Sequence, residues 1–140
     1  MTTAIDTNVL IALWNRDDTL NTQARTALDS ALARGKLVIS GPVFCELLAA
    51  PSRTEAFLDR FCGDTGILVD WHLGEAVWRS AGRAFQGYVI RRSRQRGSAP
   101  RRILADFLIG AHAAENGFRL LTLDAEPYRA AFPRLAILTA

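Results

Sequence analysis

The chain is poor in residues on which several protein classes depend. Its 140 residues include only 2 cysteines, 2 histidines and, at Lys36, one lysine. Two cysteines cannot build a disulfide framework, and nothing near them has the paired spacing of zinc ligands. We therefore expect Cys45 and Cys62 to behave as small buried hydrophobic residues.

Long hydrophobic runs are also absent. No stretch approaches the roughly 18 uninterrupted apolar residues that a membrane helix needs, and the N-terminus lacks a basic segment followed by an apolar one. A composition of 49% hydrophobic and 22% charged residues is that of an ordinary globular protein. We expect one domain over residues 1–140, no membrane partner, and a cytoplasmic location.

The net charge of +3 is modest, but its distribution is uneven. Residues 91–102 hold six basic residues and no acidic one, so all of the basic excess lies there. Such a segment is either a solvated helix end and loop or an arm that contacts phosphates, because the guanidinium fork matches phosphate oxygens. The residues of this arm are Arg91, Arg92, Arg94, Arg96, Arg101 and Arg102.

Hydrophobic periodicity predicts strands that alternate with helices. The predicted strands are Thr2–Ile5, Leu37–Ser40, Ile67–Val69, Arg119–Leu123 and Leu135–Thr139. The predicted helices lie at about 9–14, 19–34, 43–49, 54–62, 74–94, 100–116 and 127–132, with glycine and proline at many of the boundaries. Strands joined by helices imply crossovers, and hence an α/β fold with a mostly parallel sheet of about five strands and helices on both faces.

Four carboxylates stand where a helix begins or a strand ends: Asp6, Glu46, Asp106 and Asp124. Ligand sites of such sheets gather beyond the carboxyl ends of the strands, so the topology can bring these distant positions together. Two like charges roughly 4 Å apart repel by about 4 kcal/mol at an intermediate dielectric. A converged acidic pocket would therefore need a divalent cation.

Each carboxylate also has a purely structural interpretation. Asp6 could only cap the helix that follows, and Asp124 could be an ordinary turn residue. Glu46 could lie on the exposed face of its helix. Asp106 interrupts a mostly apolar helix, where an unpaired buried carboxylate would be costly, so it favours a functional role.

The ordered set of motifs resembles the PIN-domain ribonucleases, most of all the VapC-type toxins of toxin–antitoxin pairs. The matching features are Asp6-Thr7-Asn8 after the first strand, the isolated Glu46, the run from Ala105 to Ala113 around Asp106, and the run from Leu120 to Asp124. No single motif is specific, but their order and spacing cover essentially the whole chain. The sequence departs from the pattern at Leu123, where many relatives are polar or basic, and at Glu126, which matches a further acidic position only approximately.

This resemblance implies a metal-dependent ribonuclease, an endoribonuclease toxin in the sense of that family, with Asp6, Glu46, Asp106 and Asp124 at the metal site. Carboxylate oxygens without cysteine or clustered histidine favour Mg²⁺ or Mn²⁺. Thr122 matches a catalytic polar position, and Thr7 and Asn8 match supporting ones. The implied partners are an RNA substrate guided by the arginine arm, an antitoxin protein and a second copy of the chain in a homodimer.

Other functions are weighed against this one. A phosphoaspartate receiver would need a lysine near a late strand end, and a haloacid-dehalogenase-type phosphatase would need an aspartate where Asn8 stands. The main alternative is a non-catalytic module of the same fold that binds RNA or a protein. His112 is expected to be a packing residue, and the three tryptophans are expected to be core or partner contacts rather than stacking platforms.

Overall fold

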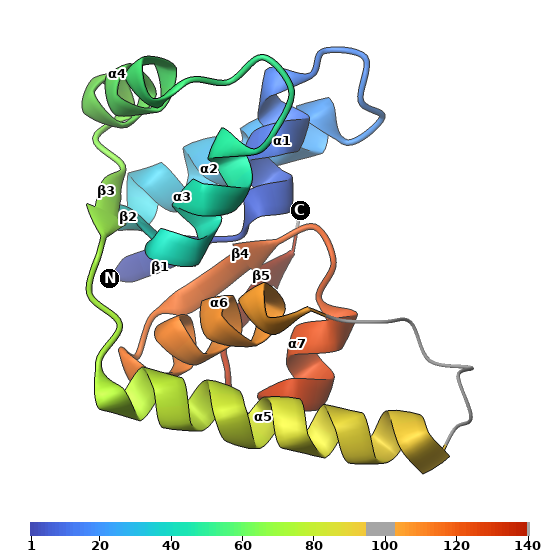
Figure 1. Cartoon of the computed structure of the whole chain (residues 1–140). Helices are drawn as coiled ribbons and strands as arrows, with labels where there is room; N and C mark the ends of the chain where they lie inside the picture. The colour runs from blue at the N-terminus through green and yellow to red at the C-terminus, as the bar shows by residue number, and fades with distance from the viewer. Residues whose placement is uncertain (95–102, 140) are drawn as a thin grey trace.

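The computed structural model describes residues 1–94 and 103–139, and it contains one five-stranded sheet (Figure 1). The strands are β1 (Thr2–Ile5), β2 (Lys36–Ser40), β3 (Leu68–Asp70), β4 (Arg119–Thr122) and β5 (Ile137–Thr139). Their order in the sheet is β3-β2-β1-β4-β5, and every neighbouring pair is parallel. The predicted α/β class with a parallel sheet is thus confirmed.

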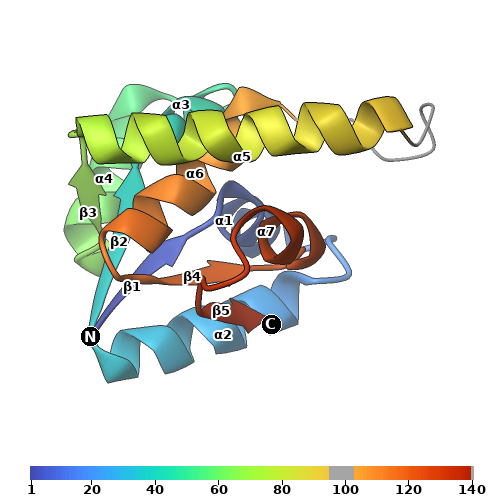
Figure 2. The ribbon, with the colours of Figure 1, turned by 90° about the horizontal axis from the view of Figure 1, so that it is seen from below.

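Helices connect the strands and cover both faces of the sheet. They are α1 (Thr7–Trp14), α2 (Asn21–Arg34), α3 (Gly41–Leu48), α4 (Glu55–Thr65), α5 (Glu75–Arg94), α6 (Leu104–Glu115) and α7 (Glu126–Ala131). Figure 2 shows α2 on one side of the sheet and α5 and α6 on the other. No helix within the described ranges combines the length and apolar character needed to cross a membrane.

The strand order places a switch point beside the central strand β1. From β1 the chain moves outward through β2 to β3, and after α5 and α6 it returns to β4 on the other side of β1. The two connections therefore diverge at the carboxyl ends of β1 and β4, which leaves a crevice where ligands bind in such sheets. The strand residues next to it are buried, with Ile5, Leu120 and Leu121 each at most 1% exposed.

Several predicted boundaries shift in the structure. Gly63, predicted as part of a turn, lies inside α4, and the helix ends instead at Gly66, whose φ of 75° is the left-handed conformation that glycine adopts easily. The last strand begins at Ile137 rather than Leu135. The predicted helix start at Pro100 falls outside the described residues, and within them α6 begins at Leu104.

The expectation that both cysteines are buried is wrong. Cys45 is exposed and Cys62 is half-buried. The buried residues of α3 are Val43 and Leu47, four positions apart on one helical face, and Cys45 between them points away from that face. Because Cys45 stands in an almost uniformly apolar stretch, the sequence did not show which face was inside.

The tryptophans divide between core and surface. Trp14 packs edge-on against Phe57 and Phe61 of α4, with ring centroids 5.1 Å apart in both pairs. Trp71 and Trp78 are instead 64% and 50% exposed. Trp14 therefore helps to hold α1 against α4, while the exposed Trp71 contacts Phe44 of α3 with ring centroids 4.8 Å apart.

Candidate active site

The four predicted carboxylates line one pocket at the carboxyl ends of β1 and β4. The pocket has a volume of about 280 Å³. Its lining residues are Asp6, Thr7, Asn8, Ile11, Glu46, Asp106, Asp124, Pro127 and Tyr128. The structure thus brings together residues from five separate segments of the chain at the switch point of the sheet.

Each carboxylate reaches the pocket from a different element. Asp6 follows β1 directly and is the N-cap of α1, while Glu46 projects from α3. Asp106 lies in the first turn of α6, where the positive end of the helix dipole favours an acidic side chain. Asp124 follows β4 and is exposed at the rim, whereas Asp6 is only 6% exposed.

Asp6 is fixed by three hydrogen bonds. Its Oδ1 accepts from the backbone N–H of Thr7 at 2.8 Å. Its Oδ2 accepts from the hydroxyls of Thr122 and Tyr128, each at 2.8 Å. Helix capping, one of the two interpretations of Asp6, is therefore real, but it engages only one oxygen of a buried carboxylate.

Burial raises the pKa of Asp6 above its usual value, because the ionised form is poorly solvated. The hydrogen bonds from Thr122, Tyr128 and Thr7 act in the opposite direction, and the charge of Asp106 adds to the upward shift. The net direction shows that this site disfavours its own negative charge when no cation is present. A bound cation would reverse that preference.

Tyr128 is a pocket residue that the sequence analysis missed. It is 3% exposed, and its hydroxyl is directed at Asp6. Burial and the charges of Asp6, Asp106 and Glu46 all raise its pKa, so the hydroxyl stays protonated and remains a donor. The only signal in the sequence was an aromatic residue with a polar tip in the short helix predicted after Asp124.

The polar residues Thr7, Asn8 and Thr122 connect the carboxylates. The Thr7 hydroxyl donates to Oε1 of Glu46 at 2.7 Å, which orients that side chain. The amide of Asn8 bridges to β4: Nδ2 donates to the Thr122 hydroxyl at 3.4 Å, and Oδ1 accepts from the N–H of Leu123 at 3.2 Å. The Thr122 hydroxyl also accepts from the N–H of Asp124 at 3.1 Å.

The donor set fits a hard cation. The pocket offers carboxylate and hydroxyl oxygens, and the ligands that Mg²⁺ and Mn²⁺ prefer are oxygens. Among the described residues, no three acidic, histidine or cysteine side chains stand close enough to chelate one ion directly. Mg²⁺ commonly keeps several water ligands and uses one or two carboxylates, so a partly hydrated ion suits this arrangement.

The predicted arginine arm is only partly described. Arg91, Arg92 and Arg94 form the last turn of α5, while Arg96, Arg101 and Arg102 lie outside the described residues. None of the first three lines the carboxylate pocket. Arg91 instead lines a separate cavity of about 260 Å³ that also includes Arg83.

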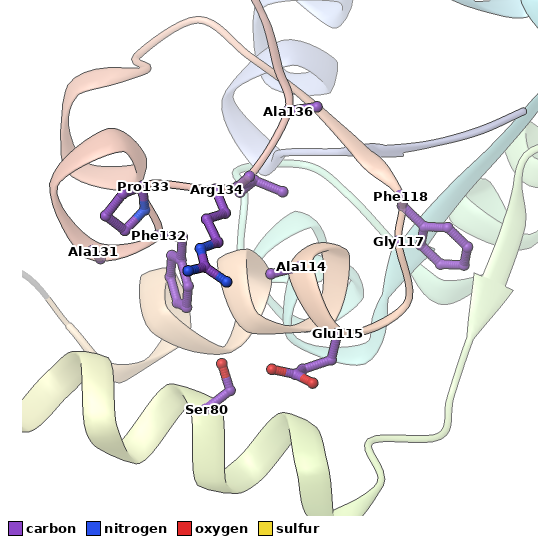
Figure 3. A pocket seen from close by; sticks show the side chains of 11 residues that line it. Ser80, Ala114, Glu115, Gly117, Phe118, Ala131, Phe132, Pro133, Arg134 and Ala136 are labelled. Carbon is purple, nitrogen blue, oxygen red and sulfur yellow. The ribbon is translucent and has the colours of Figure 1, made fainter.

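A larger cavity of about 410 Å³ lies at the other end of the strands (Figure 3). It is lined by residues just before β4 and β5, such as Phe118 and Ala136, and by Ser80, Glu115 and Arg134. It contains none of the four candidate carboxylates. A search for the larger of these two cavities would therefore miss the pocket that holds the four carboxylates.

His112 is buried, as expected of a packing residue. It is 1% exposed, and its Nε2 lies 2.9 Å from Oδ2 of Asp70 at the end of β3. Its ring also packs edge-on against Phe118, with centroids 5.6 Å apart. His112 does not line the carboxylate pocket.

Solved structures with similar folds include a toxin–antitoxin complex from Klebsiella pneumoniae and the three that follow. VapBC2 from Rickettsia felis, bound to a DNA fragment from its promoter, has a TM-score of 0.69 and 18% identity, covering 100% of this chain and 99% of that one. FitAcB from Neisseria gonorrhoeae has a TM-score of 0.66 and 20% identity, covering 98% and 96%. VapBC-1 from nontypeable Haemophilus influenzae has a TM-score of 0.68 and 18% identity, covering 99% and 98%.

At these identities the likeness establishes the fold, and the sequence itself decides the family. No curated protein matches the chain. The family model of the PIN domain matches residues 3–133, which is nearly the entire sequence and includes all four carboxylates. The chain therefore belongs to the PIN domain family.

Proposed function

We propose that this protein is a metal-dependent ribonuclease, the endoribonuclease toxin of a toxin–antitoxin pair, which hydrolyses RNA phosphodiester bonds with Mg²⁺ or Mn²⁺. The observation that carries the proposal is the convergence of Asp6, Glu46, Asp106 and Asp124 in one pocket at the switch point of the sheet. Membership of the PIN domain family and the similarity to VapBC and FitAcB structures support the same conclusion.

The residues of the pocket take distinct roles in this proposal. Asp6 and Asp106 are the main metal ligands, with Asp124 at the rim and Glu46 completing the site or orienting the attacking water. Held by these residues, a divalent cation would supply a more acidic water and would stabilise the leaving oxygen of the phosphodiester. The hydrogen bond from Thr122 to Asp6 supports a role for Thr122 in holding that carboxylate.

Supporting residues keep the carboxylates in place for that chemistry. Thr7 holds Glu46, and Asn8 ties the start of α1 to the end of β4. Side chains already held by hydrogen bonds lose little conformational entropy when substrate and metal bind. They also keep the geometry that an in-line attack on the phosphodiester requires. The arm of Arg91, Arg92, Arg94, Arg96, Arg101 and Arg102 is proposed to attract the RNA backbone, which the acidic pocket alone would repel.

The partners are part of the proposal. Because the similar structures include toxin–antitoxin complexes, we propose that an antitoxin protein binds this chain and that the chain works as a homodimer in the cytoplasm. The non-catalytic module of the same fold makes the opposite prediction about activity. Purified protein would then bind RNA or a protein and cleave no RNA.

Cleavage by purified protein tests the proposal. Wild-type protein should cut total RNA with Mg²⁺ or Mn²⁺ and stop when EDTA is added. Asp6→Asn and Asp106→Asn should each lower the rate by about 100-fold or more, since loss of a ligand should exceed the 10- to 100-fold effect of losing a supporting residue. Both variants should still bind RNA in a filter or gel-shift assay.

The matched control is Asp29→Asn, which makes the same chemical change at an exposed position of α2. It should cleave at the wild-type rate. Metal-independent cleavage, or equal activity in the Asp6→Asn and Asp29→Asn proteins, would contradict the nuclease. RNA binding without any cleavage by the wild type would favour the non-catalytic module.

A further inference from the structure

Tyr128 and Thr122 donate to the same oxygen of Asp6. Each hydroxyl lies 2.8 Å from Oδ2, while Oδ1 accepts a single hydrogen bond, from the N–H of Thr7. An ionised carboxylate has about four acceptor positions, two on each oxygen. The three bonds therefore occupy both positions on Oδ2 and one on Oδ1, which leaves the second position of Oδ1.

The Thr122 hydroxyl is committed to this arrangement. It has one proton, and its shortest acceptor is Oδ2 of Asp6 at 2.8 Å. Its oxygen accepts in turn from the N–H of Asp124 at 3.1 Å. A chain of hydrogen bonds thus runs from the backbone N–H of Asp124 through Thr122 to Asp6. The Tyr128 hydroxyl of α7 donates to the same oxygen of Asp6 at the end of this chain.

The position of Tyr128 is set by a close contact between two helices. Gly110 of α6 faces α7, and a Cβ atom on Gly110 would lie 3.1 Å from Cδ1 of Tyr128 and 2.4 Å from Cε2 of Phe132. Tyr128 lies in α7 and Phe132 directly follows the helix, and the rings of both lie next to Gly110. Because only glycine fits at this contact, α7 approaches α6 closely enough for the Tyr128 hydroxyl to reach Asp6.

We propose that Tyr128 is a positioning residue of the metal site, which together with Thr122 fixes Oδ2 of Asp6 so that Oδ1 is the oxygen offered to a divalent cation. This inference rests on the proposed function, because it assigns Asp6 as a metal ligand. The close contact at Gly110 is the structural requirement for it, because that contact sets the position of Tyr128. Loss of a partner that orients a ligand in this way typically lowers metal affinity or activity by about 10- to 100-fold.

The first experiment needs neither metal nor RNA. Tyr128→Phe removes the hydroxyl and keeps the ring that packs on Gly110. In metal-free protein it should lower the midpoint of urea unfolding, and the same change should have no further effect in an Asp6→Ala background, because the acceptor is already gone. Fully additive effects of the two substitutions would show that the hydroxyl does not act through Asp6 and would overturn the inference.

The second experiment measures Mn²⁺ binding by calorimetry without RNA. Tyr128→Phe and Thr122→Val should each weaken the affinity about 10-fold, the lower end of the range for lost supporting partners. Thr65→Val, which removes a hydroxyl bonded to the carbonyl of Phe61 in α4, is the control and should bind Mn²⁺ like the wild type. In cleavage assays the kcat of Tyr128→Phe should fall about 10-fold with an unchanged KM for RNA.

Gly110→Ala gives a second variant with an intact hydroxyl. The added methyl group should displace α7 and reproduce the Mn²⁺ defect of Tyr128→Phe, without a further loss in the double variant. If wild-type protein binds Mn²⁺ and cleaves RNA but Tyr128→Phe equals the Thr65→Val control in both assays, the inference is wrong while the proposed function stands. If wild-type protein neither binds Mn²⁺ nor cleaves RNA, the proposed function fails, and the ligand role of Asp6 fails with it.

Discussion

Asp70 and His112 form a partly buried pair that joins an edge strand to the core. His112 is 1% exposed on α6, and its Nε2 lies 2.9 Å from Oδ2 of Asp70, the last residue of β3. The hydrogen bond from His112 is the largest cause that lowers the pKa of Asp70, with smaller help from the N–H of His72. Because β3 has a neighbour on one side only, this contact is one of the few that hold its end.

Asp70→Asn should therefore destabilise the protein in a pH-dependent way. The folded state binds the Asp70 proton less tightly than the unfolded state, so the stabilisation is fully present above the ordinary pKa of 3.8 and is lost as the pH falls through the lower folded value. At pH 7 we expect a decrease of about 1 kcal/mol in the free energy of unfolding, the scale of one net hydrogen bond. Urea unfolding from pH 7 down to pH 3 would measure it.

The control for this change is Asp59→Asn at an exposed position of α4. A surface change of this kind should stay within about 0.5 kcal/mol at every pH. If the stabilities of Asp70→Asn and wild type differ by the same amount at pH 3 and pH 7, the ionised carboxylate of Asp70 is not the stabilising group.

At the residue scale, the sequence predicted the chemical types at the site better than their surroundings. The four carboxylates and the polar residues Thr7 and Asn8 were predicted from charge, position and motif order, and the structure places them in one pocket. Tyr128 was missed because its role depends on the direction in which α7 presents the Tyr128 hydroxyl. No local sequence pattern gives that direction. Cys45 was misjudged for the same reason, since an apolar run does not show which face of its helix is buried.

At the element scale, the α2–β2 connection is short and closely packed against the start of the chain. Gly35 alone separates α2 from β2, and Lys36 at once begins pairing, with its N–H donating to the carbonyl of Met1 at 3.0 Å. A Cβ atom on Gly35 would lie 1.9 Å from the carbonyl oxygen of Met1. The neighbouring atom belongs to the backbone of Met1, directly before β1, and it also accepts the hydrogen bond from Lys36, so moving it aside would disturb the start of the β1–β2 pairing.

Gly35→Ala is accordingly expected to cost about 1–3 kcal/mol in the free energy of unfolding, the range for an atom forced into a packed region. Gly63→Ala is the matched control, because Gly63 lies inside α4 and a Cβ atom there meets nothing within 4 Å. That change should stabilise the protein by about 0.5–1 kcal/mol through helix propensity. Chemical denaturation would measure the free energy of unfolding of both variants. Equal stability of the two would contradict the packing argument.

The elements themselves were largely predictable, because hydrophobic periodicity and glycine or proline signals act locally. Their ends were less so. Gly63 looked like turn chemistry, yet α4 continues past it to Gly66, since the packing of Leu58 and Phe61 outweighs the weak helix propensity of one glycine. The limits of the last strand likewise depend on how many residues pair with β4, a non-local property.

At the scale of the whole molecule, the four candidate carboxylates and the described arginines of the arm lie on different elements. The carboxylates gather at the switch point between β1 and β4, while the arginines of the last turn of α5 lie on a helix that runs along the other side of α6 (Figure 1). Such a separation suits a polyanionic substrate, whose backbone is attracted at one place and cut at another.

The arginine arm predicts a salt-dependent contribution to RNA binding. Arg91→Gln combined with Arg94→Gln should weaken binding of single-stranded RNA and reduce the slope of log affinity against log salt by about 0.7 for each phosphate that an arginine no longer neutralises. Binding is measured in an Asp6→Asn background so that RNA is not consumed. Arg25→Gln, on the exposed surface of α2, should leave the slope unchanged. If the double variant keeps the salt slope of the Asp6→Asn protein, Arg91 and Arg94 do not contact the RNA backbone.

The sequence by itself determined the alternation of strands and helices, the parallel sheet that such alternation requires, and the residue types able to bind a hard cation, because periodicity, crossover handedness and ligand chemistry are local or topological properties. Only the tertiary structure decided how the pocket is built. The approach of α7 to α6 at Gly110, the resulting hydrogen bond from Tyr128 to Asp6, and the contact between His112 and Asp70 all join segments far apart in sequence. Side-chain packing sets those distances to within tenths of an ångström, and no local pattern encodes them.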